Sequence, residues 1–369
     1  MKIPLFTPHV GEEEINAVTE VLRSKWWGLG PKTQEFENRF ASYIGSKYAI
    51  ALNSATAGLH LSLKVLNITS GEILVPAITF ISTALAADYN NCTPVFVDVN
   101  EDTLTMDIED LKRKITKKSK AIIPVHYGGH PCDMDEINQI AKEHNLFVIE
   151  DAAHASGAEY KGKKVGSLAD MAVFSFHPVK NLATGDGGMI TTNDEEVNKR
   201  LRKLRWCGIN KDTFTREGKS YSWYYEIDEL GYKFHMNDIN AAIGLAQLAK
   251  LDNFNNRRRE IFEKYNTELK NIVQTPIEKE HIKSAIHNYA IKVPEEKRDA
   301  LMDFLAQKGI STGVHYFPLH LHPIYKHIKA DVPVSDRIWK KIVLLPMFPD
   351  LTKEQIEYII SSVKEFFEK

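Results

Sequence analysis

Three polar sites in this chain of 369 residues each come directly after a short apolar segment. They are Asp151, Lys180 and the turn 53–56. In an open α/β sheet, ligands gather beyond the carboxyl ends of the strands, so polar residues that follow strands are the first candidates for a site. Together these three places offer a carboxylate, an amine and a polar turn.

Lys180 is the candidate nucleophile. A lysine forms an imine with an aldehyde cofactor where its ammonium group can lose a proton. Lys180 follows the apolar run 172–176 and precedes the glycine-rich bend 181–188, which lets backbone approach a ligand closely. The alternative is a solvated surface lysine, since the chain has 47 Lys and Arg residues and most such side chains are exposed. The residues around Lys180 must therefore distinguish an imine-forming lysine from a surface lysine.

Asp151 and His154 lie close together at the end of another predicted strand. An aspartate there can pair with a protonated pyridine nitrogen, which keeps the ring cationic and able to accept electrons. A loop aspartate that caps the next turn is the equally weighted alternative. His154 fits either a contact with a cofactor ring or one with backbone groups.

The turn Ser54-Ala55-Thr56 opens a segment with helical spacing. Unpaired N–H groups and the positive end of the helix dipole make such a place a seat for phosphate. An ordinary N-cap is the alternative, and in isolation it is the favoured one.

The elements that position these residues follow an α/β pattern. From about residue 11, helical segments alternate with short strands rich in β-branched residues, which is typical of a large, mostly parallel sheet covered by helices. A first helix has an apolar stripe at Ile15, Val18, Val21 and Leu22. Strands are expected at 48–52, 73–76, 94–98, 121–125, 146–150, 172–176 and 189–192.

The pattern changes near Leu251. We predict a large domain over residues 1–250 and a smaller C-terminal α+β domain over 251–369. The smaller part is expected to contain a helix over 253–269, strands near 287–293 and 313–316, and a last helix that begins at Thr352 as N-cap.

The composition excludes some classes of protein. With 47 basic and 49 acidic side chains the net charge is −2, so no overall field favours nucleic acid or an anionic membrane. Cys92, Cys132 and Cys207 form no CxxC pair, which favours a reducing compartment. No signal peptide or membrane-spanning segment is evident, and a cytoplasmic location is expected.

Longer motifs carry a family resemblance. The chain resembles the nucleotide-sugar aminotransferases of the DegT/StrS type, which are fold-type I enzymes dependent on pyridoxal phosphate (PLP). The motifs that carry the resemblance are residues 28–32 with 36–37, 53–59, 75–80, 125–134, 150–155, 173–181, 241–248 and 314–316.

The resemblance implies roles for the candidate residues. Lys180 would hold the cofactor as an imine and later move the proton between substrate and cofactor carbons. The other implied roles are a bond from Asp151 to the pyridine nitrogen, a stack of Phe80 on the ring, phosphate contacts from Ala55, Thr56 and Ser175, and a place for His154 near the ring hydroxyl.

One segment departs from the family pattern. Where relatives often read Gly-Tyr-Asn-Tyr-Arg-Met, this chain has Lys233 and His235 in place of Asn and Arg. In the family this segment reaches the partner subunit's cofactor phosphate. A homodimer is therefore implied, with Lys233 as a point-charge ligand for the phosphate.

Substrate contacts are expected from two regions. The resemblance favours hydrogen bonds to the sugar nucleotide over a metal site in the histidine-rich stretch 315–322. Adjacent tryptophans at 26–27 also fit core or interface packing. The candidate substrate-binding residues are Trp27, Leu29, Gly30, His315, Tyr316 and His320.

The predicted function is transfer of an amino group from an amino acid, L-glutamate by analogy, to a nucleoside-diphosphate keto sugar for amino-sugar and glycan biosynthesis. The first alternative is a PLP-dependent sugar dehydratase, although relatives with that chemistry have histidine in place of Lys180. The second is a PLP-binding sensor without turnover. A nicotinamide dehydrogenase is disfavoured because no GxGxxG follows the first strand.

Overall fold

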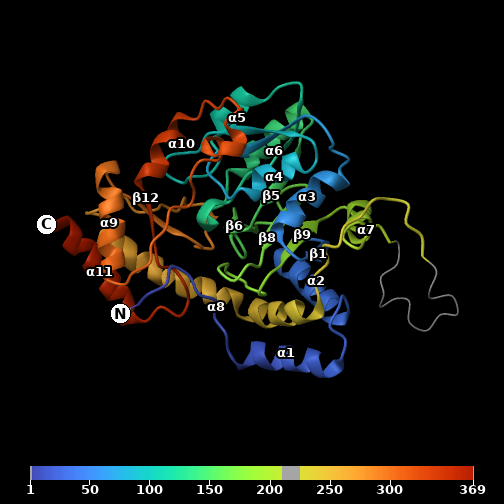
Figure 1. Ribbon diagram of the computed structural model, residues 1–369, viewed down its shortest axis with the longest axis horizontal. Coiled ribbons are helices and arrows are strands. Elements are labelled where there is room, and N and C mark those ends of the chain that lie inside the picture. Colours follow the sequence, from blue (N-terminus) through green and yellow to red (C-terminus); the bar gives the residue numbers. More distant parts are fainter. Residues whose placement is uncertain (1, 210–224, 369) are drawn as a thin grey trace.

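The computed structural model describes residues 2–209 and 225–368. Its centre is a seven-stranded sheet flanked by helices (Figure 1). The strands lie in the order β1 (Tyr48–Leu52), β9 (Gly188–Thr192), β8 (Met171–Ser175), β5 (Phe147–Asp151), β4 (Ser119–Ile122), β2 (Glu72–Pro76) and β3 (Thr93–Val97).

The sheet is mostly parallel, as the sequence predicted. Neighbouring strands from β8 through β3 run parallel, whereas β9 is antiparallel to both β1 and β8. Each of the seven predicted strands overlaps one of these strands. The largest shift is at 121–125, where β4 ends at Ile122 and Val125 makes only an isolated bridge to Asp151.

Helices cover both faces of the sheet because successive strand residues point to opposite sides. On β1, Ile50 and Leu52 pack with helices α3, α4 and α7, whereas Ala49 and Ala51 pack with α2 and α8. Further along the sheet, α5 and α6 pack on the same face as α2. The helices of this part are α1 (Glu12–Ser24), α2 (Pro31–Ile44), α3 (Ala55–Val65), α4 (Ser82–Asp88), α5 (Ile108–Lys114), α6 (Met134–His144), α7 (Glu195–Leu204) and α8 (Asp238–Leu269).

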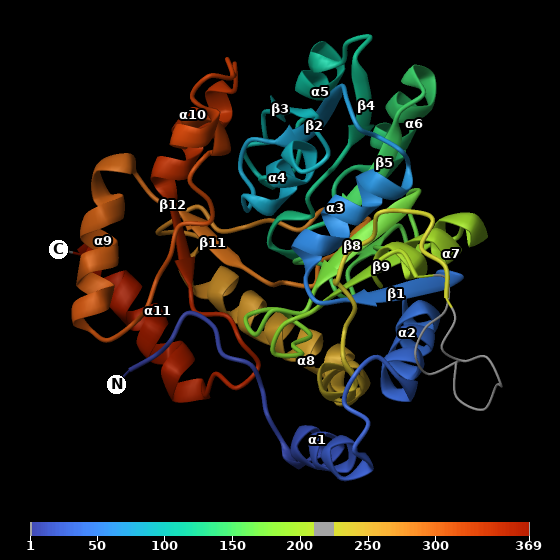
Figure 2. The ribbon, with the colours of Figure 1, turned by 45° about the vertical axis from the view of Figure 1, so that its right-hand side comes forward.

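Helix α1 lies outside this core, against α8 (Figure 2). Its predicted apolar stripe is only partly buried. Val21 is buried, but Ile15 and Leu22 are 50% and 43% exposed. The spacing of the apolar residues predicted the helix correctly. It did not predict which of these side chains are buried against the rest of the protein.

The C-terminal part is built on a second, two-stranded sheet. Antiparallel β11 (Tyr289–Lys292) and β12 (Ile342–Leu345) share a core with helices α9 (Glu295–Gln307) and α11 (Lys353–Glu368). Thr352 caps α11 as predicted, since its hydroxyl accepts a hydrogen bond from the Gln355 N–H at 3.2 Å.

The remaining elements of the chain are α10 (Pro333–Ile338), β6 (Glu159–Tyr160), β7 (Lys163–Lys164), β10 (Ile282–Lys283) and the 3₁₀ turns η1 (Tyr127–Gly129), η3 (Leu319–Leu321), η4 (Pro323–Tyr325) and η5 (Trp339–Lys341).

Two features of this part differ from the sequence-based expectation. No strand forms at 313–316, because Gly313 makes only an isolated bridge to Leu344. The helix expected at 253–269 is the second half of α8, which runs unbroken from Asp238. The predicted boundary between residues 250 and 251 therefore falls inside a helix, and the division into two domains stays a prediction.

The N-terminal segment joins the C-terminal core. Ile3 is fully buried there, and its N–H donates to the carbonyl of Gly309 at 2.8 Å. Both chain ends lie on the side of α9 and α11 (Figure 1). This attachment places Leu5 and Phe6 near the carboxyl ends of the parallel strands.

Candidate active site

A cavity of about 420 Å³ opens at the carboxyl ends of the parallel strands. The segments that follow β2, β4, β5 and β8 all contribute to its wall, as the strand directions require. Its lining includes Leu5, Phe6, Ser54, Ala55, Thr56, Thr79, Phe80, Ser82, Thr83, Val125, Asp151, Ala153, His154, Ser175, His177, Lys180, Asp186, Gly187, His315 and Tyr316.

Lys180 lies in this cavity at a tight turn after β8, where its N–H donates to the carbonyl of His177 at 2.9 Å. Burial of its side chain lowers the pKa of the ammonium group to about 8, although the nearby Asp151 carboxylate opposes this. About a tenth of the amine is therefore neutral at pH 7, far more than in a solvated lysine. The surface alternative for this lysine is excluded.

Asp151 ends β5 and is 5% exposed. The Thr83 hydroxyl donates to Oδ2 at 2.8 Å, and the Ala153 N–H donates to Oδ1 at 3.2 Å. Burial raises the pKa of the carboxyl group, whereas these two donors and the Lys180 ammonium lower it. A cation bound against Asp151 would further favour the ionised form.

The third group is the N-terminus of α3. The Ser54 hydroxyl caps the helix by accepting from the Ala57 N–H at 3.1 Å. Within the described residues, the backbone N–H groups of Ala55 and Thr56 donate to no hydrogen-bond acceptor. Both residues line the cavity. Ser175, 8% exposed, lines it as well. The turn is thus both an N-cap and an open seat for an anion.

A glycine lets this seat form. Gly188, the first residue of β9, lies so close to the turn that a Cβ there would be 2.5 Å from the carbonyl carbon of Ser54. The glycine-rich bend after Lys180 therefore allows a close approach between β9 and the start of α3.

Aromatic rings form the wall beside His154. The ring of His154 is 4.5 Å from that of His287, and Phe6 stacks on His287 at 5.2 Å. The ring of Tyr316 stacks on His315 at 4.7 Å. Phe80 stands at the mouth, 56% exposed, as a side chain that packs on a bound ring would.

The histidines of this wall are neutral. Burial and the nearby Lys180 ammonium lower the pKa of His315 to about 4, and they lower those of His154 and His287 well below the ordinary value. The neutral rings act as hydrogen-bonding groups and not as fixed positive charges.

Five predicted site residues do not line the cavity of this chain. Lys233 lies with its Nζ 3.4 Å from the centre of the Trp206 ring, and His320 bonds to Asp336 at 2.8 Å. Trp27 is 52% exposed, and its indole N–H donates to the carbonyl of Leu22. Leu29 and Gly30 lie at the start of α2, next to Trp26.

Several lining residues were not predicted. Thr83, in helix α4, donates a hydrogen bond to Asp151. Phe6, in the N-terminal segment, also lines the cavity. The spacing of Thr79 and Thr83, four residues apart after β2, is the one sequence signal that could have indicated a shared polar face. Nothing in the sequence of the first six residues indicates that Phe6 lines a site.

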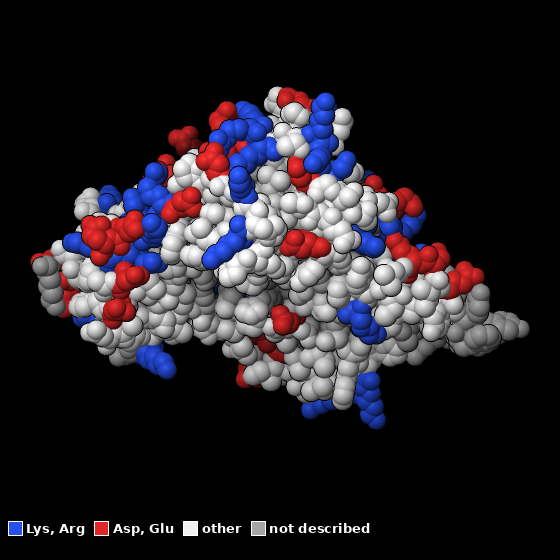
Figure 3. Space-filling view, turned by 45° about the horizontal axis from the view of Figure 1, so that its top comes forward, with Lys and Arg blue, Asp and Glu red and all other residues white. Residues whose placement is uncertain are grey.

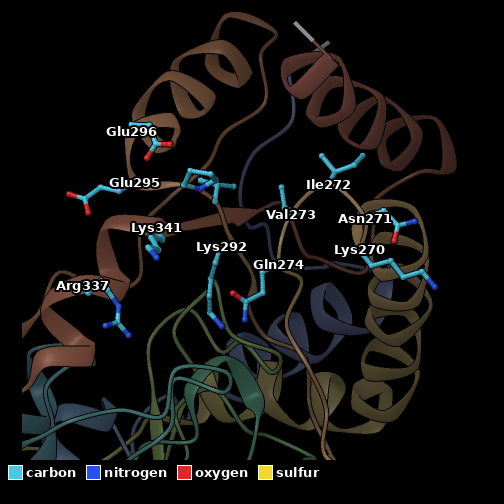
Figure 4. A pocket seen from close by; sticks show the side chains of 12 residues that line it. Lys270, Asn271, Ile272, Val273, Gln274, Lys292, Glu295, Glu296, Arg337 and Lys341 are labelled. Atoms are coloured by element: carbon cyan, nitrogen blue, oxygen red, sulfur yellow. The ribbon is translucent and has the colours of Figure 1, made fainter.

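A larger cavity of about 910 Å³ lies between α8, β11 and the start of α9 (Figure 4). Its basic lining residues are Lys270, Lys292, Arg337 and Lys341. Lys292 donates to the carbonyl of Asp102 at 3.1 Å, and Arg337 pairs with Glu101 at 2.8 Å. Because Lys292 and Arg337 already have oxygen partners, we regard this cavity as a weaker candidate for a site.

The described residues can be compared with the requirements of a metal site and of a membrane-spanning helix. They contain no group of three His, Cys, Asp or Glu side chains placed to hold a metal ion. No helix within them is long and apolar enough to cross a bilayer. Basic and acidic side chains are intermixed over the face seen in Figure 3.

Comparisons with known proteins point in one direction. A model of the DegT/DnrJ/EryC1/StrS aminotransferase family matches residues 8–364. The chain is 41% identical over 375 residues to the spore coat polysaccharide biosynthesis protein SpsC of Bacillus subtilis, and the match covers 98% of this chain and 96% of that protein.

Solved structures agree over the whole chain. The putative sugar aminotransferase Spr1654 from Streptococcus pneumoniae, in its PMP form, has a TM-score of 0.94 at 34% identity and covers 100% of this chain and 99% of its own. The same protein is known in a PLP form. Helicobacter pylori PseC, an aminotransferase involved in the biosynthesis of pseudoaminic acid, has a TM-score of 0.94 at 29% identity and covers 100% of both chains.

Proposed function

Because the chain belongs to the DegT/DnrJ/EryC1/StrS aminotransferase family, we propose that it moves an amino group from L-glutamate to a keto sugar carried by a nucleoside diphosphate. The observation that carries this proposal is the meeting of Lys180, Asp151 and the N-terminus of α3 in one cavity. Those three groups match the aldehyde, ring nitrogen and phosphate of pyridoxal phosphate.

Pyridoxal phosphate is the cofactor of this family, and the cavity fits it. When bound, it supplies an aldehyde that takes up an amino group and a ring that accepts the electrons released when a C–H bond breaks. The buried amine of Lys180 suits the aldehyde, since its pKa of about 8 leaves a reactive neutral fraction.

The other groups would hold the ring in place. Asp151 would pair with the ring nitrogen and keep it protonated. Ala55, Thr56 and Ser175 would bind the phosphate, Phe80 would pack on the ring, and His154 would lie beside the ring hydroxyl. Once free of the cofactor, the Lys180 amine would carry the proton between the two reacting carbons.

Two of the predicted substrate residues, His315 and Tyr316, face the same cavity and would contact the sugar. In a homodimer, Lys233 would reach the cofactor phosphate of the partner subunit, and Trp27, Leu29, Gly30 and His320 remain proposed contacts of the sugar nucleotide. SpsC and PseC act in polysaccharide and pseudoaminic acid biosynthesis, which supports a role in glycan or amino-sugar synthesis for this chain as well.

A spectroscopic half-reaction tests the assignment. The protein with pyridoxal phosphate should be yellow, and L-glutamate should bleach the colour with release of one 2-oxoglutarate per site. Lys180→Ala should bind the cofactor but lose the absorbance of the imine, and Lys180→Arg is the matched control that keeps the positive charge. A colourless wild-type protein would contradict the proposal.

The second half-reaction separates the alternatives. The bleached protein should regain colour with a nucleoside-diphosphate keto sugar, and mass spectrometry should detect the amino sugar. Loss of a sugar hydroxyl without nitrogen transfer would instead indicate a dehydratase. A yellow protein that no amino acid bleaches would indicate a sensor. Sedimentation would test the homodimer.

A further inference from the structure

His154 has both ring nitrogens engaged. The backbone N–H of Gly128 donates a hydrogen bond to Nδ1, with 3.3 Å between the two nitrogens. The hydroxyl oxygen of Tyr316 lies 3.1 Å from Nε2. A backbone N–H can only donate, so Nδ1 must be unprotonated, and a neutral imidazole then carries its proton on Nε2. Turning the ring over would place a carbon against the Gly128 N–H, so this contact also fixes the orientation of the ring.

This tautomer sets the direction of the bond to Tyr316. Because Nε2–H donates to the phenolic oxygen, the hydroxyl proton of Tyr316 must point away from His154. Tyr316 lines the cavity, and the contact with His154 is the one hydrogen bond that its hydroxyl makes among the described residues. The O–H of Tyr316 therefore faces the cavity as a donor.

The surroundings preserve this arrangement. Burial lowers the pKa of His154 well below its ordinary value, and the Lys180 ammonium and His315 act in the same direction. Burial also raises the pKa of Tyr316, with Asp151 adding to the effect. The titratable groups around Tyr316 are thus His154, His315, Asp151 and, from η1, Tyr127. Neither partner of the bond changes its charge near neutral pH.

We propose that the Tyr316 hydroxyl is a one-way hydrogen-bond donor to the phenolic oxygen on the ring of the bound cofactor, which leaves the aromatic ring of Tyr316 for the sugar contact proposed above. His154 is the positioning residue that fixes the direction of this bond. This role rests on the proposed function. On pyridoxal phosphate the ring oxygen is attached next to the aldehyde carbon, on the side away from the phosphate arm. With Lys180, Asp151 and the start of α3 assigned to the other groups, the His154–Tyr316 pair matches this remaining oxygen.

Such a donor changes the acidity of the lysine–cofactor chromophore. When the phenolic oxygen on the cofactor ring is anionic, it attracts the proton on the nitrogen that Lys180 contributes, and this attraction raises the pKa of that proton. A donor from Tyr316 draws the negative charge of the oxygen away from that proton, so it lowers the pKa of the chromophore. Removing the donor raises that pKa.

A pH titration of the yellow band in the holoenzyme tests this directly. Tyr316→Phe is expected to raise the midpoint by about one unit, which corresponds to the loss of one hydrogen bond to a charged group. Tyr289→Phe is the matched control, since the Tyr289 hydroxyl donates to Asn266 at 2.7 Å in the C-terminal core. An unchanged midpoint in Tyr316→Phe overturns the inference, whereas a wild-type protein without the band overturns the proposed function.

Two variants of His154 test the direction of the bond. His154→Gln offers the same donor and acceptor, so its midpoint should stay within a few tenths of a unit of wild type. His154→Glu can only accept, so it should turn the Tyr316 proton away from the cavity and raise the midpoint. Its negative charge also raises the midpoint, and the double variant with Tyr316→Phe separates the two effects. In the Glu background, Tyr316→Phe should add no further shift, and a full additional shift would overturn the positioning role of His154.

Discussion

Thr83 donates its hydroxyl proton to Oδ2 of the buried Asp151 at 2.8 Å. The hydroxyl of Thr79 lies 2.9 Å from that of Thr83. Because the single proton of Thr83 is used by Asp151, Thr79 must be the donor in that second bond. Two hydroxyl groups thus form a polarised chain that ends on the carboxylate assigned to the cofactor nitrogen.

Thr83→Val should weaken cofactor binding. The change keeps the shape of the side chain but removes a donor that favours the charged form of Asp151, so we expect about tenfold weaker binding of pyridoxal phosphate. Equilibrium titration of the absorbance measures this. Thr83→Ser keeps the hydroxyl and should bind as wild type does, and equal affinity for the Val variant would contradict the role of the bond.

The pKa of Lys180 predicts how cofactor uptake depends on pH. Only the neutral amine attacks an aldehyde, so the rate at which cofactor-free protein turns yellow should rise with pH and level off above about 8, and not above 10.5. Asp151 raises this pKa, so Asp151→Asn should move the midpoint to lower pH, by about one unit. Stopped-flow absorbance measures both midpoints. A midpoint near 10 in the wild-type protein would contradict the burial of Lys180.

Gly188→Ala should damage the phosphate seat. Its Cβ would lie 2.6 Å from the amide nitrogen of Ala55, which forces the start of α3 away from β9. We expect about 1–3 kcal/mol lower stability from this overpacking, together with weaker cofactor binding. Gly28→Ala is the control, because a Cβ at Gly28 meets nothing within 4 Å. Thermal unfolding and a cofactor titration on both variants measure the two effects.

The sequence predicted the parts of the site that follow strands. Apolar runs located β5 and β8, and Asp151 and Lys180 come at or just after their ends, where chemistry and position agree. The sequence left the start of α3 open between an N-cap and a phosphate seat. The N-cap at Ser54 is confirmed, whereas the phosphate seat stays a prediction that the position of Ala55 and Thr56 in the cavity wall supports.

Contacts that depend on how distant segments pack were beyond a reading of the sequence. The alternation of apolar residues is the same for either strand direction, so the antiparallel run of β9 could not be inferred. Phe6 reaches the cavity because Ile3 is anchored in the C-terminal core. Lys233 lies over Trp206 in this chain, and a contact with a partner's cofactor depends on an assembly that one sequence does not specify.

The buried carboxylate of Glu37 ties α2 to β1, the strand that leads into the phosphate seat. It is 2% exposed, accepts the Ala51 N–H at 2.9 Å, and forms ion pairs with Arg202 and Arg205. Burial acts to raise its pKa, but the two arginines outweigh burial, so the pKa lies below 4.5. The stability from this group is therefore complete above pH 4.5 and is lost as the pH falls through the folded-state pKa.

Glu37→Gln should destabilise the protein by about 3–5 kcal/mol near neutral pH, because it removes the counter-charge from the buried guanidinium group of Arg205. The variant should also lose less stability than wild type as the pH falls below 4.5, since the group that titrates there is gone. Glu35→Gln on the same helix is the matched control, because the Glu35–Arg39 pair is exposed and its removal should change little. Urea unfolding at several pH values measures both effects, and equal losses in the two variants would show that Glu37 does not brace β1.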